Sequence, residues 1–232
     1  RASSPVSHDT GLLARGAWVL FKHLNEPDQA RTMLDRAVAH RPKDPAVLTR
    51  LGWTLHRLGE KDTAATVLSE AITLNPKKPA VRKELAGVLT AAGRFKEATG
   101  LYADLLKETP GDMDLETRLA EVTLWAGDAP AALERLSKLL AADFRRPALW
   151  KAYVDAASAA RELTPAQVDL ARRVAVEPPP DGTGDEQAIY YSRLAWALHN
   201  AKAPSADVTR LLDRAVALKP TDPKARGEIA GV

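Results

Sequence analysis

The chain has 232 residues and a formal net charge of +3, and 45% of its residues are hydrophobic and 27% charged. This ordinary globular composition excludes intrinsic disorder, collagen and a disulfide-rich scaffold. No apolar run is long enough to span a bilayer. The positive charge is too small for the clustered basic composition of a nucleic-acid-binding domain, so we expect no nucleic-acid partner.

Cysteine is absent, which excludes disulfides, thiolate metal sites and a cysteine nucleophile. This absence fits a reducing cytoplasm and a bacterial periplasm equally, so both compartments stay open. The chain begins with Arg1, and no apolar leader segment follows it. We therefore expect a processed product or a part of a longer protein.

Proline recurs at a fixed spacing. Sixteen prolines are many for a helical chain, and Pro42, Pro76 and Pro110 lie 34 residues apart. Three other series share this spacing: Gly59, Gly93 and Gly127; Leu51, Leu85 and Leu119; and Ala64, Ala98 and Ala132. An internal period of roughly 20 to 50 residues predicts stacked structural repeats.

Each period is expected to encode two helices, as residues 45–78 illustrate. Four leucines follow a helical spacing in the first half of this stretch: Leu48, Leu51, Leu55 and Leu58. Gly59 is the residue type that commonly ends a helix in the left-handed conformation. Asp62 is expected to cap a second helix, and Pro76 ends it because proline cannot continue a helix.

This pattern resembles the tetratricopeptide repeat, a helix–turn–helix unit of about 34 residues. The residues of 45–78 that carry the resemblance are Leu48, Leu51, Gly52, Leu55, Gly59, Ala64, Leu68, Ala71 and Pro76. The resemblance implies an all-α fold, namely a right-handed α-solenoid of stacked antiparallel helix pairs. It implies about six repeats and the first helix of a seventh.

The expected organisation begins with a tail at residues 1–9. Five repeats follow, at residues 10–44, 45–78, 79–112, 113–146 and 147–178. Residues 179–187 are expected to form an inserted loop, which is either a tolerated surface insertion or a joint that redirects the superhelix. Residues 188–232 hold the sixth repeat and the start of a seventh, because Pro223–Val232 resembles Pro79–Val88.

Three repeats depart from the family pattern. Arg82 replaces a large apolar residue, Phe144 replaces the proline, and Arg161 replaces the turn glycine. Thr164 and Pro165 are expected to cap and begin the second helix of residues 147–178. Solenoids need polar capping ends, and none is evident here, so we expect the chain to be a fragment of a larger protein.

No catalytic or metal-binding pattern stands out. The five histidines include no i, i+4 pair with a third ligand nearby, so no zinc site is expected. There is no phosphate-binding glycine loop and no nucleophile elbow. We therefore expect that the chain is not an enzyme and binds no metal or cofactor.

The resemblance implies that the first helix of each repeat lines a concave groove that faces a partner. The candidate residues there are Lys22, Trp53, His56, Arg57, Lys83, Glu121, Trp125, Trp196 and His199, and Trp18 occupies the same repeat position as Trp53. Indole offers an apolar face and one N–H donor, and partly exposed tryptophans are frequent hot spots. These tryptophans either fill space between neighbouring first helices or contact a ligand, whereas Trp150 is expected in the core.

Charge also divides along the expected groove. Its N-terminal part is basic, through Lys22, Arg57 and Lys83, and its middle is acidic, through Asp114, Glu121 and Asp155, with Lys151 between them. Such a field orients an extended partner, although a solvated face without a partner would show the same charges. The asparagines that chaperone-binding members of the family use to hold a carboxylate are absent.

Three functions stay open. The first is a non-catalytic protein–protein interaction scaffold that binds a protein or peptide segment in the concave groove. The second is the arm of a bacterial polysaccharide-export or secretion machine in the periplasm. The third is a non-catalytic arm of an enzyme whose catalytic domain lies outside these residues.

Overall fold

The computed structural model describes residues 5–178 and 181–232, and the regular elements of these ranges are all α-helices. Residues up to 110 hold α1 (Pro5–Lys22), α2 (Pro27–Ala39), α3 (Pro45–Arg57), α4 (Lys61–Leu74), α5 (Pro79–Ala91) and α6 (Phe95–Glu108). The later residues hold α7 (Met113–Trp125), α8 (Ala129–Ala142), α9 (Pro147–Ala159), α10 (Pro165–Val176), α11 (Gly184–Asn200), α12 (Ser205–Ala217) and α13 (Pro223–Ala230). The predicted all-α fold is confirmed.

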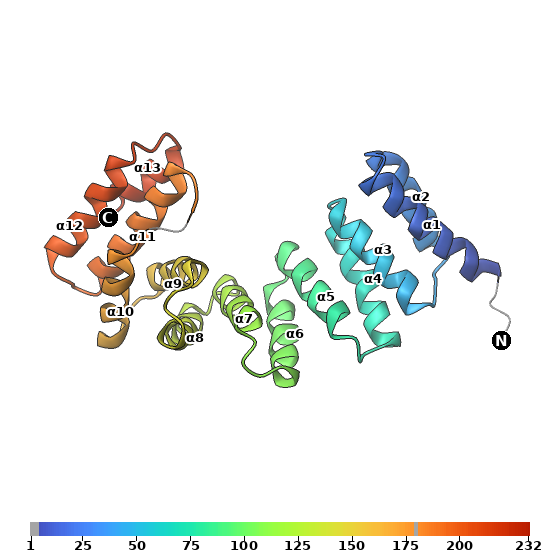
Figure 1. Cartoon of the computed structure of the whole chain (residues 1–232), viewed down its shortest axis with the longest axis horizontal. Coiled ribbons are helices and arrows are strands. Elements are labelled where there is room, and N and C mark those ends of the chain that lie inside the picture. The colour runs from blue at the N-terminus through green and yellow to red at the C-terminus, as the bar shows by residue number, and fades with distance from the viewer. Residues whose placement is uncertain (1–4, 179–180) are drawn as a thin grey trace. The chain divides into compact units, whose positions relative to one another are not determined.

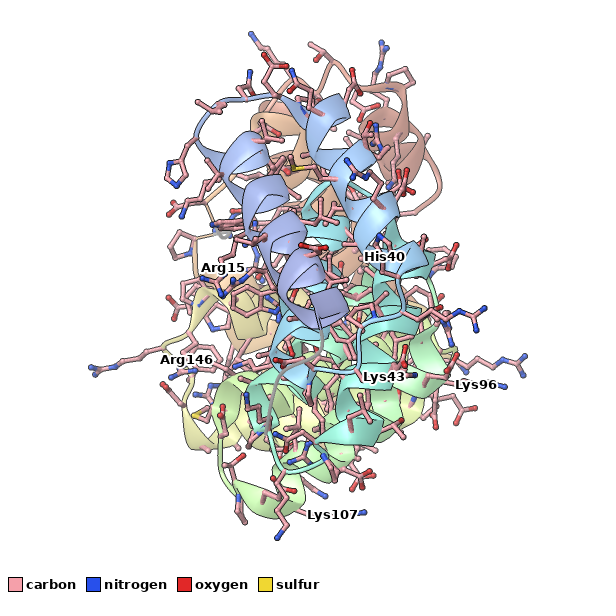
Figure 2. The ribbon with its side chains drawn as sticks, turned by 90° about the vertical axis from the view of Figure 1, so that its right-hand side faces the viewer. Arg15, His40, Lys43, Lys96, Lys107 and Arg146 are labelled. Atoms are coloured by element: carbon pink, nitrogen blue, oxygen red, sulfur yellow. The ribbon has the colours of Figure 1, made fainter. Side chains whose placement is uncertain are left out.

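The chain divides into two compact units, Arg1–Pro110 (unit 1) and Gly111–Val232 (unit 2). In unit 1, α1 packs on α2, α3 on α4 and α5 on α6, and α1 also contacts α3 (Figure 1). Figure 2 shows α1 and α2 side by side, with Lys96 and Lys107 of α6 pointing away from the ribbon. In unit 2, α7, α9, α11 and α13 contact one another in order, so the first helices of successive pairs form a row.

Within residues 5–178 and 181–232, no helix combines the length and the apolar character that crossing a bilayer requires.

Prolines begin many of these helices as well as ending them. Pro45, Pro79 and Pro147 each occupy the first turn, where the missing N–H costs nothing and the fixed φ suits the helix. Asp44 caps α3 by accepting a hydrogen bond from the Ala46 backbone N–H at 2.7 Å. The spacing of prolines in the sequence is therefore the spacing of helix boundaries.

Five of the six turns within a pair contain a left-handed residue, and the α9–α10 turn, where Arg161 replaces the glycine, contains none. Gly59, Gly93 and Gly127 have φ values of 87°, 75° and 97°. Asn25 and Lys202 take the same place after α1 and α11, both with φ of 55°. At these two turns the left-handed conformation is kept without glycine, at some cost in backbone strain for the lysine.

Small residues let the two helices of a pair approach closely. One alanine in each of four successive pairs is fully buried, namely Ala30, Ala64, Ala98 and Ala132. At Gly52 the approach is closer still, because a Cβ atom built there would lie 2.4 Å from Cγ of Leu68. These positions leave no room for a larger side chain.

Two expected boundaries are corrected. Residues 5–9, assigned to a tail, belong to α1, which begins at Pro5. Residues 184–187, assigned to the inserted loop, belong to α11, whose first turn is fixed by a capping box between Thr183 and Glu186. Residues 1–4 and 179–180 lie outside the described ranges.

The expected cap at Asp62 is also wrong. The residue that precedes α4 is Glu60, and Asp62 lies inside the first turn. An acidic side chain there still favours the helix, because it faces the positive end of the helix dipole. By contrast, Thr164 caps α10 as expected, and its side chain accepts a hydrogen bond from the Gln167 N–H.

The departures from the repeat pattern are accommodated by specific contacts. Phe144, in place of a proline, packs against the Trp150 ring at 5.8 Å and lies under the Arg173 guanidinium at 4.4 Å. Trp150 is only 7% exposed, and its indole N–H donates to the Phe144 carbonyl, so it lies in the core as expected. Arg82 reaches out of its apolar position to form a two-pronged ion pair with Glu108, at 2.8 and 2.6 Å.

The αL turns give a first prediction. Gly59→Ala is expected to lower the free energy of unfolding by about 1 kcal/mol, because only the backbone conformation opposes the new methyl group; no atom lies within 4 Å of its Cβ. Lys202→Gly, at the matching turn, is expected to be neutral or stabilising by up to about 1 kcal/mol. Urea unfolding of both variants checks the pair, and a destabilised Lys202→Gly would contradict it.

The helix interiors give a second prediction. Gly52→Ala is expected to cost about 1 to 3 kcal/mol, because the methyl group collides with Leu68 across the α3–α4 interface. Gly87→Ala is the matched control within α5, where no atom lies within 4 Å of the new Cβ. It should stabilise the protein by roughly 0.5 to 1 kcal/mol, because alanine is the better helix former. Equal effects in urea unfolding would refute the close-approach explanation.

Candidate functional site

In unit 1 a cleft lies between α1 and α3. It has a volume of about 280 Å³ and is lined by Trp18, Ala46, Thr49, Arg50 and Trp53. Trp53 is 45% exposed, because its neighbours Gly52 and Leu55 face the core and turn it away from the buried side of α3. Trp18 is half-buried. The two indoles therefore leave an open apolar hollow between the first helices.

Basic side chains surround this cleft. Lys22 places its Nζ atom 5.2 Å from the centre of the Trp18 ring, a cation–π distance. Arg50 lines the cleft itself, and Arg57 lies one helical turn after Trp53; both are exposed. We refer to Trp18, Lys22, Arg50, Trp53, Arg57 and Lys83 together as the cationic surface of unit 1.

Helix α5, the first helix of the third pair in unit 1, contacts α3 through His56. The His56 Nδ1 atom lies 3.0 Å from Oε1 of Glu84 on α5, and both side chains are about a quarter exposed. Lys83 is exposed and occupies the place on α5 that Thr49 has on α3, 34 residues earlier. The His56–Glu84 contact therefore links α5 to α3. It also means that one ring nitrogen of His56 already has a partner within the chain.

In unit 2 a larger hollow runs along the row of first helices. It has a volume of about 610 Å³, and we name it the unit 2 groove. Its lining residues are Leu124, Trp125, Asp155, Ser158, Ala159, Ser192, Arg193, Trp196, Glu228, Gly231 and Val232. Trp125 and Trp196 are 49% and 38% exposed. The groove therefore offers two half-exposed indoles around a polar centre.

That polar centre is an ion-pair network. Arg193 of α11 donates to Asp155 of α9 at 2.7 Å and to Glu228 of α13 at 2.8 Å. Hydrogen bonding to Glu228, and next to Asp155, raises the pKa of Arg193 above its ordinary value, although burial opposes this. Asp155 also accepts from Lys151 at 2.8 Å. The charges of this network largely compensate one another.

The other predicted residues of unit 2 lie outside the lining of the groove. Glu121 pairs with Arg118 at 2.9 Å, along the same helix. His199 is exposed and stacks on Trp196, with 6.2 Å between ring centres and 28° between ring planes. His199 thus supports one face of an indole that lines the groove, and Glu121 has a local partner.

The structure thus brings Trp53 together with Trp18 in unit 1, and Trp125 with Trp196 in unit 2. Three charged lining residues were missed by sequence reasoning, namely Arg50, Arg193 and Glu228. Arg193 and Glu228 lie 35 residues apart, close to one repeat period. A search for opposite charges one period apart would have found this pair.

Within the described ranges, no group of three His, Cys, Asp or Glu side chains is arranged to hold a metal ion.

Two sequence models of one family match the chain. Both describe a tetratricopeptide repeat; one matches residues 55–112 and 89–155, and the other matches residues 17–79. No curated protein matches the chain significantly in sequence.

Solved structures share the fold. A tetratricopeptide repeat protein from Parabacteroides merdae has a TM-score of 0.65 at 17% identity, covering 96% of this chain and 86% of its own. PilW, a type IV pilus biogenesis factor, has a TM-score of 0.61 at 17% identity, covering 97% and 99%. YrrB, described as having an unusual peptide-binding site, has a TM-score of 0.60 at 15% identity, covering 84% and 96%. At these identities the likeness shows the fold alone.

The ion-pair network gives a third prediction. Arg193→Ala is expected to cost about 1 to 3 kcal/mol of unfolding free energy, because it takes the donor from partly buried Glu228 and leaves Asp155 with Lys151 alone. Arg118→Ala removes an exposed pair along one helix and should change stability by at most about 0.5 kcal/mol. Urea unfolding of both variants measures the difference. Equal losses would show that the network is no stronger than an exposed pair.

Proposed function

Because the chain belongs to the tetratricopeptide repeat family, we propose that it is a non-catalytic scaffold whose first helices bind a segment of a partner protein. The fold is in general that of a protein–protein interaction scaffold. The observation that supports the finer proposal is the exposure of Trp53, Trp125 and Trp196, at 45%, 49% and 38%, beside hollows. Half-exposed indoles beside a concavity are the usual anchors of an interface.

Two exposed apolar side chains on second helices contrast with these tryptophans. Leu74 and Val216 are 44% and 57% exposed on second helices. Single exposed apolar residues of this kind are ordinary on a protein surface. The tryptophans instead share two hollows with Trp18 and with each other. An extended segment that enters either hollow would bury indole surface on two sides.

The volumes of the hollows suit different parts of a segment. The unit 2 groove, at about 610 Å³, lies within the usual range of ligand sites, roughly 300 to 1,000 Å³. The cleft of unit 1, at about 280 Å³, is enough for one large side chain. We therefore assign each unit its own binding surface.

The similar structures support a role in binding a protein or peptide, but they do not indicate which partner this chain binds. YrrB is described by its peptide-binding site, and PilW by its part in type IV pilus biogenesis. The arm of a polysaccharide-export machine is the second candidate, and the cationic surface of unit 1 is the feature that favours it. The two candidates differ in ligand chemistry, so binding experiments separate them.

A peptide library tests the proposal. Random peptides displayed on phage are selected on the whole chain, and the enriched peptides are then measured by fluorescence anisotropy. Trp53→Ala or Trp125→Ala is expected to weaken the peptides that bind its unit by about 2 kcal/mol, roughly thirtyfold. Far-ultraviolet circular dichroism should stay unchanged, because both side chains lie outside the core.

The matched controls are Leu74→Ala and Val216→Ala, which remove exposed apolar side chains from second helices of the same two units. They are expected to leave peptide affinity unchanged. Failure to enrich any peptide, or equal losses in the control and tryptophan variants, would refute a peptide-binding role for the first helices.

A further inference from the structure

We propose that the cationic surface of unit 1 selects an acidic peptide segment that places one aromatic side chain between Trp18 and Trp53. This inference rests on the proposed function and specifies the chemistry of the partner for one of its two surfaces. It depends on the shape of the cleft, on the unpaired charges around it and on the few polar groups that line it.

The shape of the cleft favours one flat side chain. Trp18 and Trp53 lie on neighbouring first helices, and two smaller residues of α3, Ala46 and Thr49, line the same hollow. The hollow of about 280 Å³ is open between two aromatic walls. An aromatic ring inserted there would contact both indoles, and aromatic pairs are stabilising beyond the area that they bury.

The cations of this surface form no ion pair with a carboxylate of the described residues. Arginines elsewhere, such as Arg82, Arg135 and Arg193, form ion pairs with carboxylates. Among residues 5–178 and 181–232, no carboxylate forms an ion pair with any of four cations of this surface: Lys22, Arg50, Arg57 and Lys83. The adjacent carboxylate, Glu84, is engaged by His56.

Unpaired cations arranged around one anchor impose a charge preference. Arg57 follows Trp53 by one turn, about 6 Å along the helix axis. An extended segment advances about 3.3 Å per residue, so acidic residues two to four positions from the anchor would lie near these cations. At an ionic strength of about 0.1 M charges interact over about 10 Å, so the cations nearest the anchor attract the acidic residues of such a segment.

The unit 2 groove lacks this preference. Its single arginine, Arg193, is satisfied by Asp155 and Glu228, and Asp155 is also paired with Lys151. The groove thus presents two indoles but no excess of positive charge. Selection for acidic residues is therefore expected from unit 1 alone.

A peptide fits the cleft better than a saccharide does. The Thr49 hydroxyl already donates to the Pro45 carbonyl at 2.6 Å, and the other lining groups besides Arg50 and the indole N–H groups are apolar. A sugar ring carries several hydroxyl groups, which would lose hydrogen bonds to water on entry. An aromatic side chain has none to lose.

The experiment uses the whole chain and fluorescein-labelled synthetic peptides. The probe has one phenylalanine between two pairs of glutamates. One companion replaces the phenylalanine with alanine, and another replaces the glutamates with lysines. Both companions are expected to bind at least about tenfold more weakly in fluorescence anisotropy. The affinity of the probe is expected to fall as NaCl rises. Equal binding of the glutamate and lysine peptides would overturn the proposal.

Variants assign the binding to this surface. Trp53→Ala and the double change Arg50→Glu with Arg57→Glu should each weaken the acidic probe about tenfold or more. Leu74→Ala and Arg36→Glu are the controls, because they make similar changes on second helices of unit 1. Both controls should leave binding unchanged, and circular dichroism confirms folding. Loss of binding in the controls, or none in the surface variants, overturns the proposal.

The library selection separates the two proposals. Peptides that are enriched and depend on Trp53 or Trp125, but carry no excess of acidic residues, would overturn this inference and leave the proposed function standing. No enrichment would overturn both. A soluble polyuronate that displaces the probe and binds independently of Trp53 would assign the cationic surface to an acidic glycan instead.

Discussion

The structure depends on close packing between helices that cannot bury their apolar sides alone. Ala30, Ala64, Ala98 and Ala132 are fully buried, one in each of four successive pairs. Their small size lets the partner helix approach, and within each unit neighbouring pairs then cover one another's apolar sides, as in other repeat proteins. Because the same contact recurs every 34 residues, the turns and prolines must recur with it. One side of each first helix is left outside this packing, and the exposed tryptophans lie there.

Repetition explains which parts of the fold the sequence predicted. The helices of residues 45–142 follow the period closely, because their positions are set by contacts that recur. The boundaries were wrong at Pro5 and Gly184, where the period is interrupted and local chemistry decides. Thr183 and Glu186 form a capping box that does not belong to the repeat. The sequence shows that Phe144 and Arg82 depart from the repeat pattern. It does not show the contacts that compensate for them, because those contacts are made with residues that are close only in the folded chain.

The same distinction applies to the candidate site. A tryptophan placed outside the apolar stripe is visible in the sequence, so Trp53, Trp125 and Trp196 could be found without coordinates. Whether a charged side chain is free is a property of its neighbours. His56 had the position of a ligand-binding residue, yet it is engaged by Glu84 of the next first helix. Arg193 was missed because its two partners lie on other helices of unit 2.

Arginine therefore has two different roles in this chain. Some arginines form ion pairs that hold helices together, and others form no ion pair and keep their charge at the surface. In the Arg193 network, attraction is used to hold α9, α11 and α13 together, and little of it remains for a ligand. On the first helices of unit 1, by contrast, Lys22, Arg50 and Arg57 form no ion pair with any carboxylate of the described residues. Such like charges repel one another, and the cation–π contact of Lys22 with Trp18 offsets part of this repulsion. These charges stay in contact with solvent and remain open to a ligand, whereas the charge of Arg193 is used within unit 2.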